Sequence, residues 1–291
     1  MQIALYAVLC AIWGSTWLVI KVGYGGLGPF NVAALRFLLA GALLAPLVPL
    51  LGARWPAGRT AWTIVAVEGV VLFGGDYGLI YWAEQSLDSG LTAILFATLP
   101  LITAAMAHVF VPGERLTTRT LAGTLLAFVG VVVLFADHLR IDPGKVGPMS
   151  AIVGAAVCAA VAGVVAKRYG AALHPAALNA PAMVVGAVVL AAASLVAGDG
   201  IAFPRLASTW GAIGYLAVAG SVVTFLIYFS LLKTWSVTSL SFISVFTPAV
   251  ALLLGALLLG EPLTLITIAG AAMILAGVVM TVTGRARNHR S

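Results

Sequence analysis

Residues 98–130 read TLPLITAAMAHVFVPGERLTTRTLAGTLLAFVG, and residues 246–277 read FTPAVALLLGALLLGEPLTLITIAGAAMILAG. Each stretch has a proline in an apolar run, then a Gly-Glu-x-Leu motif, then two glycines seven residues apart. Gly113 and Gly260 open the two motifs 147 residues apart, and the first stretch has one extra residue before its motif. Tyr81 and Tyr228 share this offset of 147, and Lys21 and Pro29 match Lys167 and Pro175 at 146. Such an ordered series predicts an internal duplication.

The composition places the duplicated unit in a membrane. Hydrophobic residues make up 62% of the 291 positions, charged residues 8%, and the mean hydropathy is +1.13. A soluble domain of this length has roughly a quarter of its residues charged. Each membrane-spanning helix needs about 20 apolar residues. Ten runs of about that length lie at 3–22, 30–51, 61–83, 89–111, 119–136, 148–166, 175–197, 207–231, 236–259 and 264–283. The first run lacks a basic leader and a cleavage motif, which favours a retained helix over a signal peptide.

The repeat gives each half five helices, so the second half must enter the membrane from the opposite side. We therefore expect an all-α integral membrane protein of ten transmembrane helices in two inverted five-helix repeats, an architecture typical of secondary carriers. The predicted divisions are a first repeat at 1–136, a connecting loop at 137–147, a second repeat at 148–283 and a basic tail at 284–291.

Lysine and arginine in the loops predict the orientation. Ten of them lie on the side of the N-terminus and four on the other side, while Arg36 lies within a span. This bias predicts cytoplasmic N- and C-termini in a bacterial inner membrane. The formal net charge of +6 is explained by basic loops facing anionic lipid, so no nucleic-acid partner is expected.

Several of these residues resemble a known family. Trp13-Gly14-Ser15 with Lys21, Arg36, and the two Pro…Gly-Glu-x-Leu segments are similar to EamA-type carriers of the drug/metabolite transporter superfamily. The resemblance covers the whole chain and implies a central cavity built mainly from helices 1–4 and 6–9. Its members export amino acids, other metabolites or drugs, and the chain is similar to the aromatic-amino-acid exporters among them. The second half has no tryptophan matching Trp13 and has Ala182 opposite Arg36, which predicts an asymmetric site.

Aromatic side chains deep in the spans are the first candidate site residues. Trp13 and Trp17 lie four residues apart and so share one helix face. Tyr77 and Tyr81 form a similar pair in the third span, and Tyr215 and Tyr228 lie in the eighth. Such rings could line a pocket for an aromatic or cationic solute. The alternative is packing between helices.

Charged residues inside the spans are the second group, because such residues are costly and usually functional. Arg36 and Asp76 lie at similar depth, which predicts that they pair or that Arg36 binds a substrate carboxylate; a purely structural ion pair is the alternative. Glu68 and Asp76 are candidates for carrying a coupling proton, and Glu68 could instead hydrogen-bond a neighbouring helix. Glu114 and Glu261 precede new helices, where carboxylates stabilise helix N-termini, so a structural role is expected.

The third group of candidate residues consists of prolines and glycines within the spans, together with their neighbouring hydroxyl residues. Pro100 and Pro248, with Thr98 and Thr247 just before them, are predicted to break helices 4 and 9 at equivalent places and act as hinges. Ser241 and Ser244 are spaced to share one face of helix 9 with Pro248, which is predicted to form part of the cavity wall. The glycines of helices 5 and 10 permit close helix packing or mark a homodimer contact.

Together these features predict a secondary transporter that exports small organic solutes, foremost aromatic or hydrophobic amino acids and related metabolites, by alternating access. A carrier of cationic drugs or other metabolites is the alternative. The predicted substrate-binding residues are Trp13, Ser15, Trp17, Arg36, Asp76, Tyr77, Tyr81, Thr98, Tyr215, Ser244 and Thr247. The sequence has no phosphate-binding loop and no metal-ligand motif, so neither cofactor, metal nor ATP is expected. Rivals from other classes are an intramembrane hydrolase using Ser221 and His108, and a non-transporting sensor or scaffold.

Overall fold

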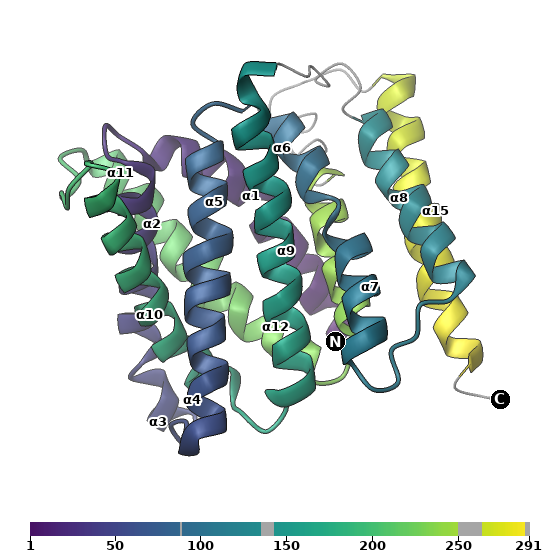
Figure 1. The fold of residues 1–291 in the computed structure, drawn as a ribbon, viewed down its shortest axis with the longest axis horizontal. Helices are drawn as coiled ribbons and strands as arrows, with labels where there is room; N and C mark the ends of the chain where they lie inside the picture. The colour runs from purple at the N-terminus through teal and green to yellow at the C-terminus, as the bar shows by residue number, and fades with distance from the viewer. Residues whose placement is uncertain (88, 135–142, 250–263, 289–291) are drawn as a thin grey trace.

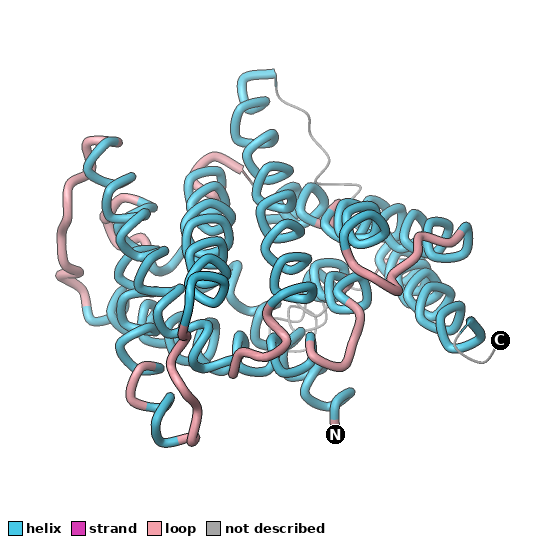
Figure 2. Tube along the Cα trace, turned by 60° about the horizontal axis from the view of Figure 1, so that its bottom comes forward, coloured by secondary structure: helices cyan, strands magenta, loops and turns pink. Residues whose placement is uncertain are grey.

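The computed structural model describes residues 1–291 apart from 88, 135–142, 250–263 and 289–291, so Glu261 lies outside the described residues. The described residues form helices joined by short loops and contain no strand (Figure 2). In the first half the helices are α1 (Gln2–Gly23), α2 (Pro29–Leu44), α3 (Leu47–Leu50), α4 (Gly58–Val67), η1 (Glu68–Asp76), α5 (Tyr77–Ala83), α6 (Ser89–Phe96), α7 (Leu99–Phe110) and α8 (Thr118–Leu134). In the second half they are η3 (Pro143–Lys145), α9 (Val146–Tyr169), α10 (Pro175–Val196), α11 (Ala207–Ala217), η4 (Val218–Val223), α12 (Thr224–Leu232), α13 (Val237–Ser241) and α15 (Leu265–Asn288).

These helices combine into the predicted spans. Within the described residues, seven helical segments are long and apolar enough to cross a membrane, and three shorter apolar helices lie at Thr118–Leu134, Val237–Ala249 and Ile268–Thr281. Each of the ten falls on one of the predicted apolar runs, which confirms the ten-helix prediction. The helix α1 begins and α15 ends at the same end of the bundle, as an even number of crossings requires (Figure 1).

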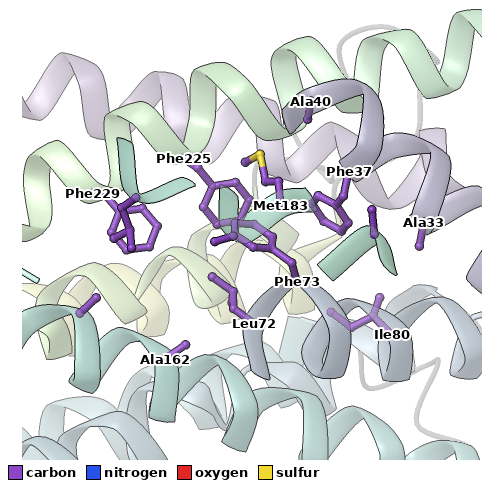
Figure 3. Packing of buried hydrophobic residues seen from close by; sticks show 14 of the residues in the cluster. Ala33, Phe37, Ala40, Leu72, Phe73, Ile80, Ala162, Met183, Phe225 and Phe229 are labelled. Carbon is purple, nitrogen blue, oxygen red and sulfur yellow. The ribbon is translucent and has the colours of Figure 1, made fainter. Parts of the chain in front are cut away.

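Apolar side chains cover the outside of the bundle as well as its inside. Leu18, Val188 and Val279 are examples of large apolar residues that are mostly exposed. A helix that is hydrophobic on all sides is typical of a membrane span, because lipid surrounds it where water would surround a soluble helix. Aromatic rings pack against one another inside the bundle (Figure 3). The ring centroid of Phe73 lies 5.0 Å from that of Phe37 and 4.9 Å from that of Phe225.

Equivalent helices of the two halves pack against each other. The second helices of the repeats, α2 and α10, are in contact. The fifth helices, α8 and α15, are also in contact and lie side by side at the right-hand side of the bundle (Figure 1). The third helices of both halves also change to π-helical winding at matching places, since η4 at 218–223 corresponds to residues 71–76 within η1. This shared local feature supports the duplication inferred from the sequence.

Glycines set the distance between α8 and α15. A Cβ atom added to Gly123 would lie 2.6 Å from the carbonyl oxygen of Gly277, and one added to Gly130 would lie 2.8 Å from that of Gly270. Any larger residue would force the helices apart. All four glycines therefore serve packing within one chain, and the homodimer stays a prediction.

Glu114 connects the two halves at the start of α13. Its carboxylate accepts hydrogen bonds from the backbone N–H of Val237 at 2.8 Å and from the hydroxyl of Thr238 at 3.1 Å. The carboxylate thus stabilises a helix N-terminus. This helix belongs to the other repeat and is not α8, which follows Glu114 in the chain.

Candidate functional site

A central cavity lies between helices of both halves and has a volume of about 880 Å³, counting the space at its mouth. The first half lines it from α1, the continuous helix η1–α5, and the pair α6–α7. The second half lines it from α9, α12 and the helix that begins with α13. The lining residues are Trp13, Thr16, Trp17, Ile20, Glu68, Leu72, Asp76, Tyr77, Ile80, Phe96, Leu99, Thr103, Ala159, Gly163, Phe225, Tyr228, Phe229, Val237, Ser241, Ile243, Ser244 and Thr247.

Two carboxylates line this cavity from the two ends of η1. Glu68 is 0% exposed and Asp76 is 3% exposed. Neither oxygen of Glu68, nor Oδ1 of Asp76, has a hydrogen-bond partner among the residues that the structure describes. Buried polar groups are normally hydrogen-bonded, and π-helical turns are frequent at functional sites. Both observations make Glu68 and Asp76 candidates for binding a ligand or a proton.

Aromatic rings form the walls around the carboxylates. Trp13 packs edge-on against Phe225 with ring centroids 5.3 Å apart, and its Nε1–H donates to the carbonyl oxygen of Gly220 at 3.3 Å. Trp17 packs edge-on against Phe96 at 5.9 Å. The structure therefore places Trp13, Trp17 and Tyr77 together on one cavity, as expected from their depth in the spans.

Hydroxyl groups of helix 9 line the opposite side. Ser241, Ser244 and Thr247 donate to the carbonyl oxygens of Thr238, Ser241 and Ser244 at 2.7, 3.0 and 3.5 Å. Each hydroxyl hydrogen is therefore used within the helix, and the oxygen lone pairs remain available to a ligand.

The two helix breaks are not equivalent. In helix 4 the break falls at Ala97 and Thr98, directly before Pro100 in the first turn of α7, where proline is tolerated. In helix 9 the break falls at Phe242, six residues before Pro248. The described break in helix 9 thus does not match the place of the break in helix 4, and the hinge role of Pro248 stays a prediction. The carbonyl of Ser244, which Pro248 leaves without its backbone donor, accepts from the hydroxyl of Thr247 at 3.5 Å, and helical winding extends to Ala249, the last residue described there.

Arg36 lies outside the cavity lining. Its Nε donates to the hydroxyl of Ser221 at 2.9 Å, Nη1 to that of Tyr81 at 3.2 Å, and Nη2 to the carbonyl oxygen of Gly220 at 2.8 Å. The guanidinium also lies over the rings of Phe37 and Tyr77, at 5.0 and 4.8 Å from their centroids. Among the described residues no hydrogen bond or ion pair joins it to Asp76, although its positive charge lies close enough to act on that carboxyl group. Similar depth did not produce an ion pair, because depth leaves open which way each side chain points around its helix.

Four other predicted residues also lie off the cavity. Ser15 and Tyr215 share a hydrogen bond of 2.6 Å between their hydroxyls, in an exposed setting. Tyr81 is buried, accepts from Arg36, and its carbonyl oxygen accepts from Tyr24 at 2.8 Å. Thr98 donates to the carbonyl oxygen of Leu95 at 2.7 Å.

Sequence reasoning missed Phe96, Phe225 and Phe229, which carry much of the aromatic wall. Phenylalanine has no polar group that distinguishes a cavity from a lipid-facing position. Thr16, Ile20, Leu72 and Ile80 could have been found, because they lie three or four residues from Trp13, Trp17 or Asp76 on the same helix faces.

The hydrolase alternative is not supported by the geometry. The hydroxyl of Ser221 donates to the carbonyl oxygen of Leu216 at 2.9 Å, beside Arg36. His108 lies at the end of α7, where its Nδ1 accepts from the backbone N–H of Leu116 at 3.3 Å in an exposed setting. Each side chain hydrogen-bonds to its own backbone partner, and no hydrogen bond in the described structure joins Ser221 to His108 as a nucleophile and base would require.

Known proteins resemble this chain over its whole length. The model of the EamA-like transporter family matches residues 1–136 and 147–283. The chain is 32% identical over 290 residues to the "Uncharacterized inner membrane transporter YedA" of Escherichia coli (strain K12), covering 97% of this chain and 90% of that protein. It is 28% identical over 294 residues to the "Probable amino-acid metabolite efflux pump" of Salmonella typhimurium, covering 95% and 93%. A solved crystal structure, 21% identical, covers 98% of both chains with a TM-score of 0.83 and shows the same fold.

Proposed function

Because the chain belongs to the EamA-like transporter family, and is thus a multi-pass membrane transporter and not an enzyme, we propose that it exports aromatic or hydrophobic amino acids and related metabolites by alternating access. The observation that supports this most directly is the central cavity, which is walled by aromatic rings and built from both repeats. Carriers with inverted repeats bind substrate at the interface of the repeats, near the middle of the membrane. The resemblance to a probable amino-acid metabolite efflux pump supports the substrate class.

In the proposed mechanism the apolar part of the substrate lies against Trp13, Trp17 and Tyr77. The helix break at Thr98 and Pro100 provides a hinge in the first half, and the break at Phe242 provides its counterpart in the second. Rocking of one half against the other then opens the cavity to the opposite side. Glu68 and Asp76 are the proposed proton-coupling groups, because both are carboxylates buried at the cavity.

A second candidate function is the export of cationic amphipathic compounds. The specific observation in its favour is that the cavity combines two carboxylates with several aromatic faces, and such faces attract cations.

The membrane setting completes the proposal. We place the chain in a bacterial inner membrane with both termini in the cytoplasm, because ten of its lysine and arginine residues lie in loops and tails on that side. A thiol-reactive, membrane-impermeant reagent added to whole cells tests this with cysteines introduced singly at Arg54 and Arg205. Labelling of Arg205→Cys but not Arg54→Cys is expected, and the reverse pattern would overturn the orientation.

Uptake of labelled phenylalanine or tryptophan into proteoliposomes tests the function. Saturable uptake that excess unlabelled amino acid abolishes is expected, and an imposed pH gradient should increase the rate if Glu68 or Asp76 couples transport to protons. Uptake no greater than in protein-free liposomes, measured with folded protein, would refute the aromatic amino-acid assignment. The same assay with a quaternary ammonium compound then tests the second candidate.

A further inference from the structure

We propose that the cavity recognises its substrate by the ammonium end and that a free carboxylate weakens binding, so that aromatic amines and carboxyl-blocked amino acid derivatives bind more tightly than the free amino acids. This inference rests on the proposed function and specifies the substrate class of the same site.

The charged side chains that line the cavity are acidic. Glu68 and Asp76 are acidic, and no lysine, arginine or histidine occurs among the described residues that line the cavity. Three carboxylate oxygens of this pair lack a protein partner in the described structure. An ammonium group has three N–H donors and one positive charge, so it can donate hydrogen bonds to these unpaired oxygens and balance a carboxylate charge. A substrate carboxylate would instead add negative charge where burial weakens screening by water.

The nearby arginine does not change this conclusion. The Arg36 guanidinium is 1% exposed and outside the lining. Its three nitrogens already donate to Ser221, Tyr81 and Gly220, and two rings lie against it. Reaching a ligand carboxylate would break these buried hydrogen bonds and leave their acceptors unpaired, and this penalty opposes the movement.

The hydroxyl groups point to the same ligand. The hydroxyl hydrogens of Ser241, Ser244 and Thr247 are donated to backbone carbonyls. These hydroxyl groups can therefore only accept a hydrogen bond from a ligand. Thr103 is a lining residue whose hydroxyl has no partner within the described ranges, but a neutral donor does not offset a full negative charge. The aromatic faces of Trp13 and Trp17 add attraction for a cation.

Binding of four matched ligands to the purified full-length chain tests the proposal. We would titrate phenethylamine, phenylalanine methyl ester, phenylalanine and 3-phenylpropionate into detergent-solubilised protein at neutral pH, with isothermal titration calorimetry as the readout. The amine and the ester should bind at least about tenfold more tightly than phenylalanine, because they keep the ammonium group but lack the carboxylate, which phenylalanine must desolvate and place near Glu68 and Asp76. The carboxylic acid should bind most weakly.

Variants then assign the preference to the cavity. Asp76→Asn should weaken amine binding at least about tenfold and bring it close to that of phenylalanine, and Glu68→Gln is the second variant should Asp76→Asn fail to fold. Asp199→Asn is the matched control, because Asp199 is an exposed acid in the loop after α10. It should leave the ligand order unchanged.

The outcomes separate this inference from the proposed function. Phenylalanine binding as tightly as phenethylamine, or an amine preference that survives both cavity variants, overturns the inference. Saturable phenylalanine uptake with no amine preference overturns it while leaving the proposed function standing. Selective amine binding by a protein that moves none of these ligands into proteoliposomes would contradict the proposed function instead.

Discussion

The guanidinium Nε of Arg36 donates to the hydroxyl of Ser221 at 2.9 Å, across the boundary between the two repeats. Ser221 lies in η4, where the change from α to π winding alters which backbone carbonyls are paired. The carbonyl oxygen of Gly220 in the same turn accepts from Arg36 and from the indole of Trp13. Arg36 thus fixes the π-helical turn against the cavity wall, which is a positioning role and not a substrate contact.

Replacing Arg36 should therefore destabilise the protein without discriminating between ligands. Arg36→Ala should lower the free energy of unfolding by about 3 kcal/mol or more, because it leaves buried acceptors unpaired. Arg36→Lys should restore part of this, since lysine keeps the charge but not the forked geometry. Thermal unfolding in detergent gives the stability, with Ser221→Ala as a milder control. A selective loss of carboxylate-bearing ligands in folded Arg36→Lys would show that Arg36 binds substrate after all.

The difference between the predicted and observed roles of Arg36 shows what the sequence can determine. Hydropathy and the 147-residue repeat predicted the spans, because both depend on the order of residues along the chain. The depth of Trp13, Trp17 and Asp76 in their spans suggested that they line a site, and all three line the same cavity. Rotation about each helix axis was not predictable, since contacts with other helices set it. Tyr81 consequently lies off the cavity although Tyr77, four residues before it, lines it, and Ser15 lies off the cavity although the adjacent Thr16 lines it. The π-helical turns left no sequence signal that we recognised.

Trp17 should contribute to substrate affinity through its ring. Trp17 lines the cavity and packs edge-on against Phe96. Replacing Trp17 by alanine would therefore remove ring surface that a bound substrate can contact. Trp17→Ala should raise the concentration needed for half-maximal uptake roughly tenfold, as expected for a lost aromatic or cation contact. Trp62→Ala is the matched control, because Trp62 lies near a span end and is 49% exposed. Unchanged uptake in the Trp17 variant would remove that residue from the site.

Close approach of α8 and α15 should make their glycines intolerant of substitution. Gly130→Val would place side-chain atoms against the backbone of Gly270, so it should destabilise the protein by about 1–3 kcal/mol or more. Gly214→Ala is the control, because a Cβ there meets nothing within 4 Å and alanine favours a helix. Thermal unfolding in detergent compares the two. If size-exclusion chromatography showed a dimer that Gly130→Val dissociates without loss of stability, the glycines would serve a contact between chains.

Glu84 should make stability depend on pH. It lies one residue beyond the span that ends at Ala83, is 3% exposed, and has no hydrogen-bond partner for its carboxylate in the described part of the chain. Burial raises the pKa of this carboxyl from 4.5 to about 8, while the positive charge of Lys21 acts in the opposite direction. The folded state therefore favours the protonated form more than the unfolded state does.

The sign of the effect follows from this difference between the two states. A carboxyl group whose pKa is higher in the folded state stabilises fully below pH 4.5, and this stabilisation is lost as the pH rises to about 8. Thermal unfolding in detergent should show the native chain losing on the order of 2–5 kcal/mol of stability between pH 5 and pH 9 through this group. Glu84→Gln should flatten that dependence and be the more stable protein at pH 9, whereas Asp199→Asn should keep the native slope. An identical slope in Glu84→Gln and the native chain would mean that this carboxyl ionises in the folded protein as freely as it does in water.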